Sequence, residues 1–326
     1  MWFFESYPGM FVSQSVIHSI VALIIVERSF EIWKVDAPLL RFRYRLSVIV
    51  LPVFMFPIFQ LINPERGSFY FRHDTAIFDS LGWFELKIWD GVTVGIVFFC
   101  LALVFTSTLM LLQEIIPLIK DIKKKRRSHM HEAEGIREIL KELIKDKQVS
   151  PTPSVLIVSE EDPVIFTSGA KNPAIVLSES MIEMLEEKEL RSAIAHEVAH
   201  IIRRSNLTTL FIFAVRLIMF YNPVSLLVFR RILQDDEQVC DDITVSMTKD
   251  PYALASTLRV FYLKNVGELS KIKAIKESIE SSSHNLLLEE RIERLESAEA
   301  GRHYAFMWGR YALTLMTIIG INYYIV

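Results

Sequence analysis

Two histidines and a glutamate in the segment HEVAH, residues 196 to 200, are the residues of this chain best suited to chemistry. Residues four apart on an α-helix lie one above the other on one face, so His196 and His200 can both reach one metal ion. Glu197 then projects beside that ion, where its carboxylate can take a proton from water. This spacing is the ligand pattern of a hydrolytic zinc site and predicts one Zn²⁺ per chain.

The sequence around HEVAH predicts the helix that such a site needs. Residues 186 to 204 read EEKELRSAIAHEVAHIIRR, with no Gly or Pro to interrupt them. Apolar side chains recur at spacings of three and four, the period of one helical face. These side chains are Leu190, Ile194, Val198, Ile201 and Ile202. We therefore expect both His side chains in a partly desolvated wall, where a metal is held tightly.

The acidic segment LQDDEQVCDD, residues 233 to 242, offers a third ligand. Two His and one carboxylate leave the fourth position of zinc open for water, and we expect Glu237 to be that carboxylate. Asp241 lies one helical turn later, where it can accept the free ring N–H of one ligand His. Such a run of carboxylates is also typical of a solvated helix end. The other carboxylates remain alternatives for either role: Asp235, Asp236 and Asp242.

The span from His196 to Val245 resembles the membrane metallopeptidases typified by the BlaR and MecR antirepressor-type β-lactam sensor transducers. That family shows HExxH, a basic pair, an apolar stretch, an aromatic residue before Asn-Pro, a second apolar stretch and ExxxD, in this order. The matching residues here are Arg203 and Arg204, then Tyr221, Asn222 and Pro223, then Glu237 and Asp241. The resemblance implies a zincin-like α+β peptidase domain of the gluzincin type.

A second resemblance is to the Ste24 and HtpX-like membrane proteases, which share HExxH and ExxxD. Their late HP-x-x-x-x-R segment is matched imperfectly from His284 to Leu295, because Asn285 replaces the Pro and the Arg comes one residue later. There are departures from the BlaR-type pattern at Thr167, Ser168 and Ser205. These departures bear on substrate preference more than on metal binding.

Short β-rich runs at 155–159, 164–167 and 174–177 predict a small sheet ahead of the catalytic helix. In zincin-like sites an edge strand often holds an extended substrate by main-chain pairing. Our candidate for this strand is Val164, Ile165, Phe166 and Thr167, and a purely structural strand is the equal alternative. Just upstream, residues 132–147 predict an amphipathic helix that packs on the domain or lies at the membrane surface.

A cationic or hydroxyl group is expected to stabilise the oxyanion formed during peptide hydrolysis. The candidates for this role are Arg291, His284 and Tyr252. The two cysteines, Cys100 and Cys240, exclude a disulfide framework, and Cys240 is interpreted as a packing residue.

Composition predicts an integral membrane protein, since 51% of the residues are hydrophobic and the mean hydropathy is +0.31. Four apolar runs approach or exceed the roughly 20 residues that cross a bilayer. They lie at about 11–26, 46–62, 92–119 and 311–326. The expected fold is mainly α, with three transmembrane helices in 1–119, a peptidase domain in 120–305 and a fourth transmembrane helix in 306–326.

Basic residues predict the orientation of these spans. Arg41, Arg43 and Arg45 precede the second span, and a basic run at 120–127 follows the third, which places both loops in the cytoplasm. The amino terminus is then outside and the peptidase domain faces the cytosol, in a multi-pass protein of the cytoplasmic membrane. The first span lacks a basic n-region and a small-residue cleavage site, so we expect it to be retained.

An apolar stretch at 207–229 lies between the two metal motifs. A single crossing there would put HEVAH and Glu237 on opposite sides of the membrane, where they could not share one ion. Asn222 and Pro223 break the run near its middle, because Pro lacks a backbone donor and disfavours helix at the preceding residue. We therefore predict a re-entrant helical hairpin, with a true fifth span and no zinc site as the alternative.

The sequence thus predicts a membrane zinc endopeptidase whose Glu197 activates water toward a protein or peptide substrate. The lipid bilayer is the expected environment, and no nucleic-acid motif is present. Two alternatives stay open. One is a signal transducer that works with a regulatory membrane partner, and the other is a catalytically silent membrane scaffold.

Overall fold

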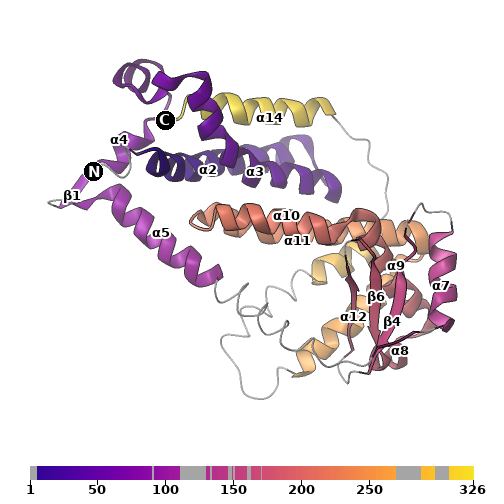
Figure 1. The fold of residues 1–326 in the computed structure, drawn as a ribbon. Helices are drawn as coiled ribbons and strands as arrows, with labels where there is room; N and C mark the ends of the chain where they lie inside the picture. The colour runs from indigo at the N-terminus through magenta and orange to yellow at the C-terminus, as the bar shows by residue number, and fades with distance from the viewer. Residues whose placement is uncertain are drawn as a thin grey trace. The chain divides into compact units, whose positions relative to one another are not determined.

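A computed structural model describes the main part of this chain, and it is mainly helical (Figure 1). The described residues are 6–89, 92–110, 130–132, 134–145, 149, 151–159, 163–169, 171–268, 288–297 and 308–326. They form two compact units. The first draws on residues 1–124, 210–235 and 305–326, and the second on 125–209 and 236–304. The residues 210–235 of the expected hairpin therefore belong to the unit that holds the apolar amino-terminal helices.

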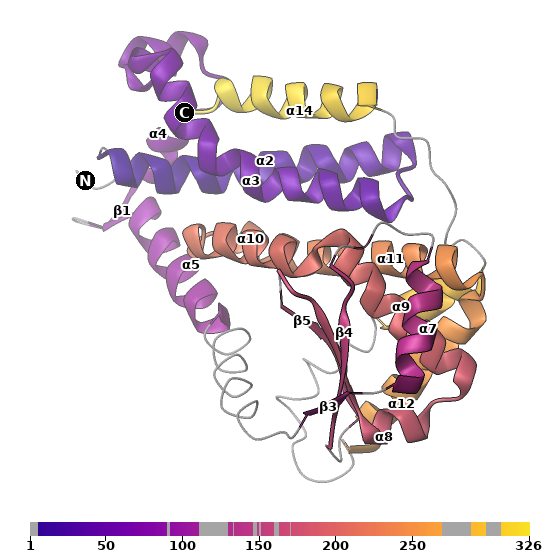
Figure 2. The ribbon, with the colours of Figure 1, turned by 45° about the vertical axis from the view of Figure 1, so that its right-hand side comes forward.

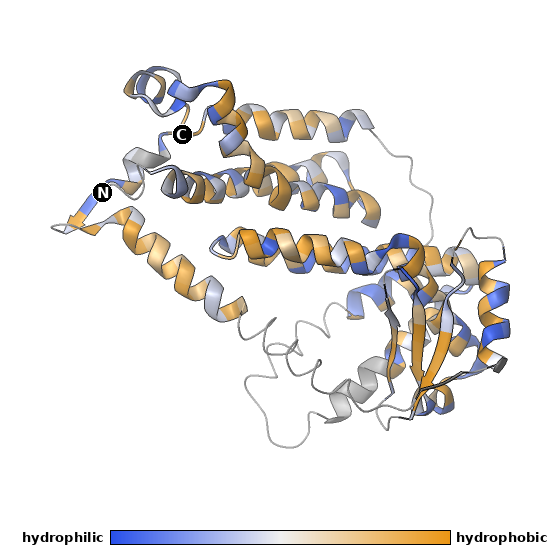
Figure 3. Cartoon of the chain, viewed as in Figure 1, coloured by the Kyte–Doolittle hydropathy of each residue, from blue (hydrophilic) through white to orange (hydrophobic). Residues whose placement is uncertain are grey.

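Two long helices dominate the first unit, α2 (Tyr7–Trp33) and α3 (Pro38–Ile62). Each begins with a Pro in its first turn, where the missing backbone donor costs nothing. Both are long and apolar enough to cross a membrane, and in Figure 3 much of both ribbons has the colour of hydrophobic residues. They extend well beyond the apolar runs predicted at 11–26 and 46–62, because polar residues continue both helices.

The two other predicted spans also contain helices, but shorter ones. Helix α5 (Val94–Met110) has 17 residues and α14 (Trp308–Tyr323) has 16, fewer than the roughly 20 that a straight crossing needs. Residues 111–119 of the predicted third span lie outside the described residues. The number of membrane crossings therefore stays a prediction.

The segment 63–90, between the second and third predicted spans, contains short helices and strands that were not predicted from the sequence. It holds the short helical turns η1 (Pro64–Gly67), η2 (Phe71–Thr75) and α4 (Ser80–Phe84). Strands β1 (Lys87–Trp89) and β2 (Val92–Thr93) then pair antiparallel. Arg66 is buried and donates to the carbonyls of Asn322 and Tyr323 at 3.0 and 2.9 Å, which ties this loop to the end of α14.

The predicted helical hairpin is present as α10 (Ser205–Ile218) and α11 (Pro223–Thr248). Asn222 makes the turn, since its side-chain oxygen accepts a hydrogen bond from the Val224 amide at 2.9 Å. Its Nδ2 donates to Ser19 Oγ on α2 at 2.9 Å, and Tyr221 shares a 2.8 Å hydrogen bond with Ser15. Helix α11 does not end at 229. It continues without a break through the acidic segment, so one helix carries both the hairpin arm and the expected third ligand.

The second unit contains a four-stranded sheet of order β3-β4-β6-β5 (Figure 2). Its strands are β3 (Met130–Glu132), β4 (Ser154–Val158), β5 (Ile165–Ser168) and β6 (Ala174–Ser178). Strands β4 and β6 are parallel, and the other two pairs are antiparallel. The three strands predicted from sequence are confirmed to within a residue. Strand β3 was not predicted, because it lies in a basic linker without an apolar run.

Helices α7 (Glu134–Ile144), α8 (Glu179–Met184) and α9 (Glu187–Arg203) build the core of this unit with the sheet (Figure 2). Helix α7 buries Ile136, Leu140 and Leu143 against α9 and β4. The predicted amphipathic helix is thus confirmed, and its apolar face packs within the domain. Helix α12 (Pro251–Glu268) lies along α9. A further helical segment at 288–296 completes the described part.

Candidate metal centre

Helix α9 positions the HEVAH residues, as the sequence predicted. Its first turn is closed by a capping box in which the Glu186 and Glu189 side chains satisfy each other's backbone amides. Leu190, Ile194 and Val198 are buried in the core beneath it. This anchored face fixes the rotation of the helix. The two His rings then lie next to each other, with centroids 4.8 Å apart.

Glu237 on α11 faces both imidazoles, so the three expected ligands come together. His196 Nε2 lies 3.3 Å from Glu237 Oε2, and His200 Nε2 lies 3.6 Å from Glu237 Oε1. Two ligand atoms bound about 2.1 Å from a tetrahedral zinc lie roughly 3.4 Å apart. The observed spacings therefore fit one ion bound by two nitrogens and one oxygen. The Glu237 side chain is 37% exposed against 13% for His196, so the cluster opens to solvent on one side.

Asp241 lies behind His196, on the side away from Glu237. His196 Nδ1 is 3.3 Å from Asp241 Oδ1, an ion-pair distance without hydrogen-bond alignment. Burial lowers the pKa of His196, but Asp241 and Glu237 outweigh burial and raise it to about 10. A metal ion must therefore displace a proton from His196.

Arg291 is the cation that holds the two carboxylates in place. Its Nε and Nη2 donate to the Asp241 carboxylate at 2.8 and 2.7 Å, and its Nη1 lies 3.2 Å from Glu237 Oε2. Burial raises the pKa of Asp241, but Arg291 more than offsets this and brings it down to about 2. The pKa of Glu237 is also well below its usual range, because Arg291 and the two His outweigh its burial. Both carboxylates are therefore ionised at neutral pH.

Cys240 lies at the second nitrogen of His200, a contact that the sequence analysis interpreted only as packing. Its Sγ is 3.4 Å from His200 Nδ1 and 3.8 Å from Ser205 Oγ. His200, Asp236 and Cys240 therefore form a second group of potential ligands. Burial raises the pKa of the Cys240 thiol, which disfavours the thiolate that a metal requires. The site with Glu237 is thus the better fit to a metal.

The remaining acidic side chains of the segment 233–242 have other partners. Asp235 accepts two hydrogen bonds from Arg45 at 2.6 and 2.7 Å. Asp236 pairs with Arg203, and Asp242 pairs with Arg294 at 2.6 Å. Glu237 and Asp241 instead lie against the two ring nitrogens of His196, which distinguishes them from the three carboxylates that charge alone left as alternatives. The solvated helix end is wrong for this segment, because Asp235, Asp236 and Asp241 are all buried.

Glu197 lies on α9 beside the ligands and is held by strand β5. Thr167 Oγ lies 2.7 Å from Glu197 Oε2, where it donates a hydrogen bond, and 3.2 Å from the Glu197 backbone oxygen. Thr167 was predicted on the candidate substrate strand, but its contact with Glu197 was not predicted. No local sequence signal marks this contact. In the described structure β5 pairs only with β6, so its other edge is unpaired.

The three oxyanion candidates fall in different places. Arg291 is buried in the cluster, where its guanidinium contacts Asp241 and Glu237. Tyr252 is 62% exposed at the start of α12, and no described polar contact joins it to the metal residues. His284 lies outside the described residues.

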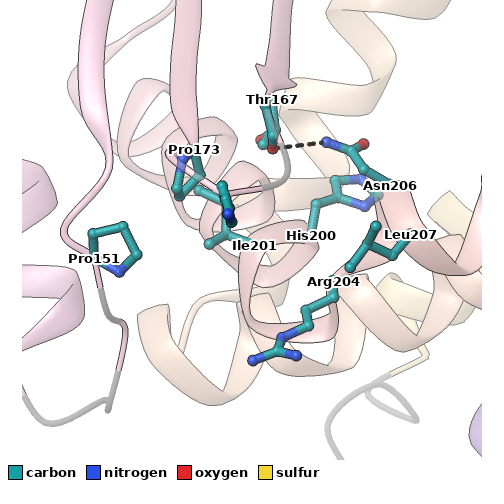
Figure 4. A pocket seen from close by; sticks show the side chains of 10 residues that line it. Pro151, Thr167, Pro173, His200, Ile201, Arg204, Asn206 and Leu207 are labelled. Carbon is teal, nitrogen blue, oxygen red and sulfur yellow. Dashed lines mark hydrogen bonds between the residues drawn. The ribbon is translucent and has the colours of Figure 1, made fainter.

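A cavity of about 320 Å³ adjoins the cluster (Figure 4). His200, Ile201 and Arg204 line it from the end of α9, and Thr167 and Lys171 line it from β5 and the turn that follows. Gly169 in this turn has φ +86°, and a Cβ there would lie 2.5 Å from the Asn172 carbonyl oxygen. Glycine is therefore required for the shape of the wall.

Membrane-length apolar helices and a cluster of two His and one Glu that could hold a metal, with a second Glu beside it, are typical of the class of membrane metallopeptidases. The chain belongs to the BlaR1 peptidase M56 family, whose model matches residues 86–282. Membership in this metallopeptidase family implies a bound metal, and the protein is located in a membrane. Both resemblances stated from the sequence are confirmed.

Curated relatives are similar over shorter stretches. The protease HtpX homolog of Streptococcus gordonii is 24% identical over 143 residues, or 43% of this chain and 47% of the relative. The protease HtpX homolog of Pelotomaculum thermopropionicum is 33% identical over 110 residues, which are 32% of this chain and 38% of the relative. The protease HtpX homolog of Thermococcus sibiricus is 35% identical over 75 residues, which are 22% of this chain and 25% of the relative. The chain spans less than half the length of these relatives.

Proposed function

We propose that this protein is a zinc-dependent endopeptidase of the cytoplasmic membrane that cleaves a membrane-associated or cytosolic protein. The observation that carries the proposal is the cluster itself. Ligand atoms of His196, His200 and Glu237 all lie within 4.8 Å of one another, and Glu197 stands beside them with its carboxylate held by Thr167. A catalytically silent scaffold does not require a carboxylate held beside a cluster of metal-ligating side chains.

His196, His200 and Glu237 hold the metal in this mechanism, and Asp241 and Cys240 set the orientation of the two imidazoles from behind. Zinc bound there supplies a Lewis acid that makes water more acidic and polarises a peptide carbonyl. Glu197 accepts a proton from the attacking water and then donates it to the amine of the leaving peptide. Thr167 keeps the Glu197 carboxylate turned toward the place where the water attacks.

Strand β5 is the proposed docking edge for the substrate. Its unpaired edge offers backbone donors and acceptors to an extended peptide, and Thr167 at the same strand touches Glu197. A peptide paired there is brought past the catalytic carboxylate in extended form. Arg291 acts in this scheme as a counter-ion that keeps Glu237 and Asp241 charged.

The topology follows from the basic residues that flank the spans. We infer four spans with the amino terminus outside and the peptidase unit in the cytosol, with α10 and the start of α11 as the re-entrant hairpin. A role in regulated proteolysis, with a regulatory membrane partner, rests on the similarity to the BlaR-type family.

The test uses full-length protein purified in detergent or nanodiscs and a library of unlabelled neutral peptides. We expect peptide cleavage that a chelator abolishes and that added Zn²⁺ restores. Glu197→Gln should bind one zinc per chain and cleave nothing. The proposal would be refuted if the Glu197→Gln variant still cleaved peptides, or if the purified wild-type protein bound no zinc.

A further inference from the structure

The cavity beside His200 carries a positive charge that the proposed reaction does not use. Lys171 and Arg204 both line it and are both exposed, and the described residues that line it include no Asp or Glu. Neither cation makes an ion pair with a carboxylate of the described residues. Among the described residues, the cavity therefore presents two cations without a carboxylate partner.

Its size and position suit one side chain of a bound peptide. Ligand pockets begin at roughly 300 Å³, and this cavity measures about 320 Å³. Figure 4 shows His200 and Arg204 on the α9 side and Thr167 on the β5 side. The walls are thus built by a metal ligand and by the residue that touches the catalytic carboxylate. A group in this cavity therefore lies next to the proposed zinc site.

We propose that this cavity is a specificity pocket that binds a carboxylate of the substrate between Lys171 and Arg204. The proposal rests on the proposed peptidase function and adds a substrate class, peptides with an acidic group near the cleaved bond. Arginine and lysine bind carboxylates through charge-assisted hydrogen bonds, which are about twice as strong as neutral ones. Ile201 and Pro173 supply the apolar wall for the side-chain methylenes.

The direction of β5 predicts which side of the scissile bond carries the acid. The strand runs from Ile165 to Ser168, and the pocket follows its carboxyl-terminal end at Gly169 and Lys171. A substrate paired antiparallel to β5 runs the opposite way. Its residues on the amino-terminal side of the scissile bond then lie at the pocket, so the preferred Glu belongs on that side.

The experiment uses an acetylated and amidated neutral decapeptide in which one Glu, Gln or Lys is moved through the central positions. Binding is measured by fluorescence anisotropy to zinc-loaded Glu197→Gln protein, and cleavage is measured with the wild type. We expect about tenfold tighter binding of Glu than of Gln at one position on the amino-terminal side. The same peptides with a free carboxyl terminus show whether a terminal carboxylate is the group bound.

Substitutions that change the charge of the cavity test whether a preference for Glu over Gln arises there. Lys171→Gln with Arg204→Gln should bring the Glu-to-Gln ratio to about one, and Lys171→Gln with Arg204→Glu should invert the preference in favour of Lys. Lys188→Gln is the matched control, because Lys188 is an exposed cation at the other end of α9. It should leave the ratio unchanged.

Each outcome is decisive for the pocket. Equal binding of Glu and Gln peptides by the wild-type pocket, or a Glu preference that survives the double substitution, overturns the proposal. The binding arm does not depend on turnover. A chain that binds the Glu peptide through Lys171 and Arg204 but cleaves nothing therefore supports the pocket while refuting the proposed function.

Discussion

Replacing Thr167 by Val removes one hydroxyl from the site and leaves the shape of the side chain nearly unchanged. That hydroxyl has a single proton, and its closest acceptor is Glu197 Oε2 at 2.7 Å, with the backbone oxygen of the same residue at 3.2 Å. The proton therefore goes to the carboxylate. Glu197 is 7% exposed, so water replaces the lost hydrogen bond only poorly.

The size of the effect follows from this geometry. A hydrogen bond to a charged group contributes about 1.5–3 kcal/mol, which corresponds to roughly 10-fold to 150-fold in kcat/KM if the whole interaction orients the catalytic carboxylate. We expect the lower end, because Glu197 keeps its place on α9. Zinc affinity should not change, since no described hydrogen bond joins Thr167 to His196, His200 or Glu237.

The assay is a steady-state measurement of kcat/KM on a neutral peptide, together with zinc content. Thr167→Ser is the control, because it restores the hydroxyl and should recover activity to within about threefold of the wild type. Full activity of Thr167→Val would refute the orienting role. Loss of zinc from Thr167→Val would show instead that the substitution disturbs the ligands.

Two more predictions concern the residues behind the ligands. Arg291→Met leaves Asp241 and Glu237 without their cation, which should cost about 3–5 kcal/mol and lower the Tm of the metal-free protein by roughly 6–20 °C. Added zinc should reverse part of this loss, and a Tm change below about 3 °C in scanning fluorimetry would contradict the ion-pair account. Cys240→Val removes the group at His200 Nδ1 and should weaken zinc binding by about tenfold in a competition titration, whereas Cys240→Ser should retain most of the affinity. Complete loss of zinc from Cys240→Ser would mean that the sulfur is itself a ligand.

Local sequence patterns predicted the parts of the site that lie within one helix. The four-residue spacing of His196 and His200 and the apolar period of 186–204 are both properties of a single helix, and α9 confirms them. The turn at Asn222 and Pro223 was predictable for the same reason, because proline acts on its own neighbours. The choice of Glu237 among five acidic residues also came from spacing, and from the resemblance to a family.

Contacts between distant segments were not predictable from the sequence. Nothing local distinguishes the hydroxyl of Thr167 from that of any other strand Thr, yet it touches a residue 30 positions away. From the sequence, Cys240 was interpreted as a small packing residue, and its contact with His200 forms only when α9 and α11 pack together. The partner of Asp235 is Arg45, which lies 190 positions earlier and served in the sequence only as a topology signal.

Helix ends were predicted less well than helix centres. An apolar run marks the part of a helix that lies in lipid or core, whereas caps and polar turns decide where it stops. Helix α2 begins at Tyr7, after Ser6 caps its first turn, and ends at Trp33, where Lys34 follows in a left-handed conformation. The predicted span at 11–26 therefore covers only its middle.

Zinc K-edge X-ray absorption of the purified protein tests the central claim most directly, because it reports the atoms bound to the metal. A site of His196, His200 and Glu237 predicts a first shell of nitrogen and oxygen at about 2.0–2.2 Å and no sulfur. A sulfur scatterer at about 2.3 Å would place the metal at His200, Asp236 and Cys240 instead, and would contradict the account.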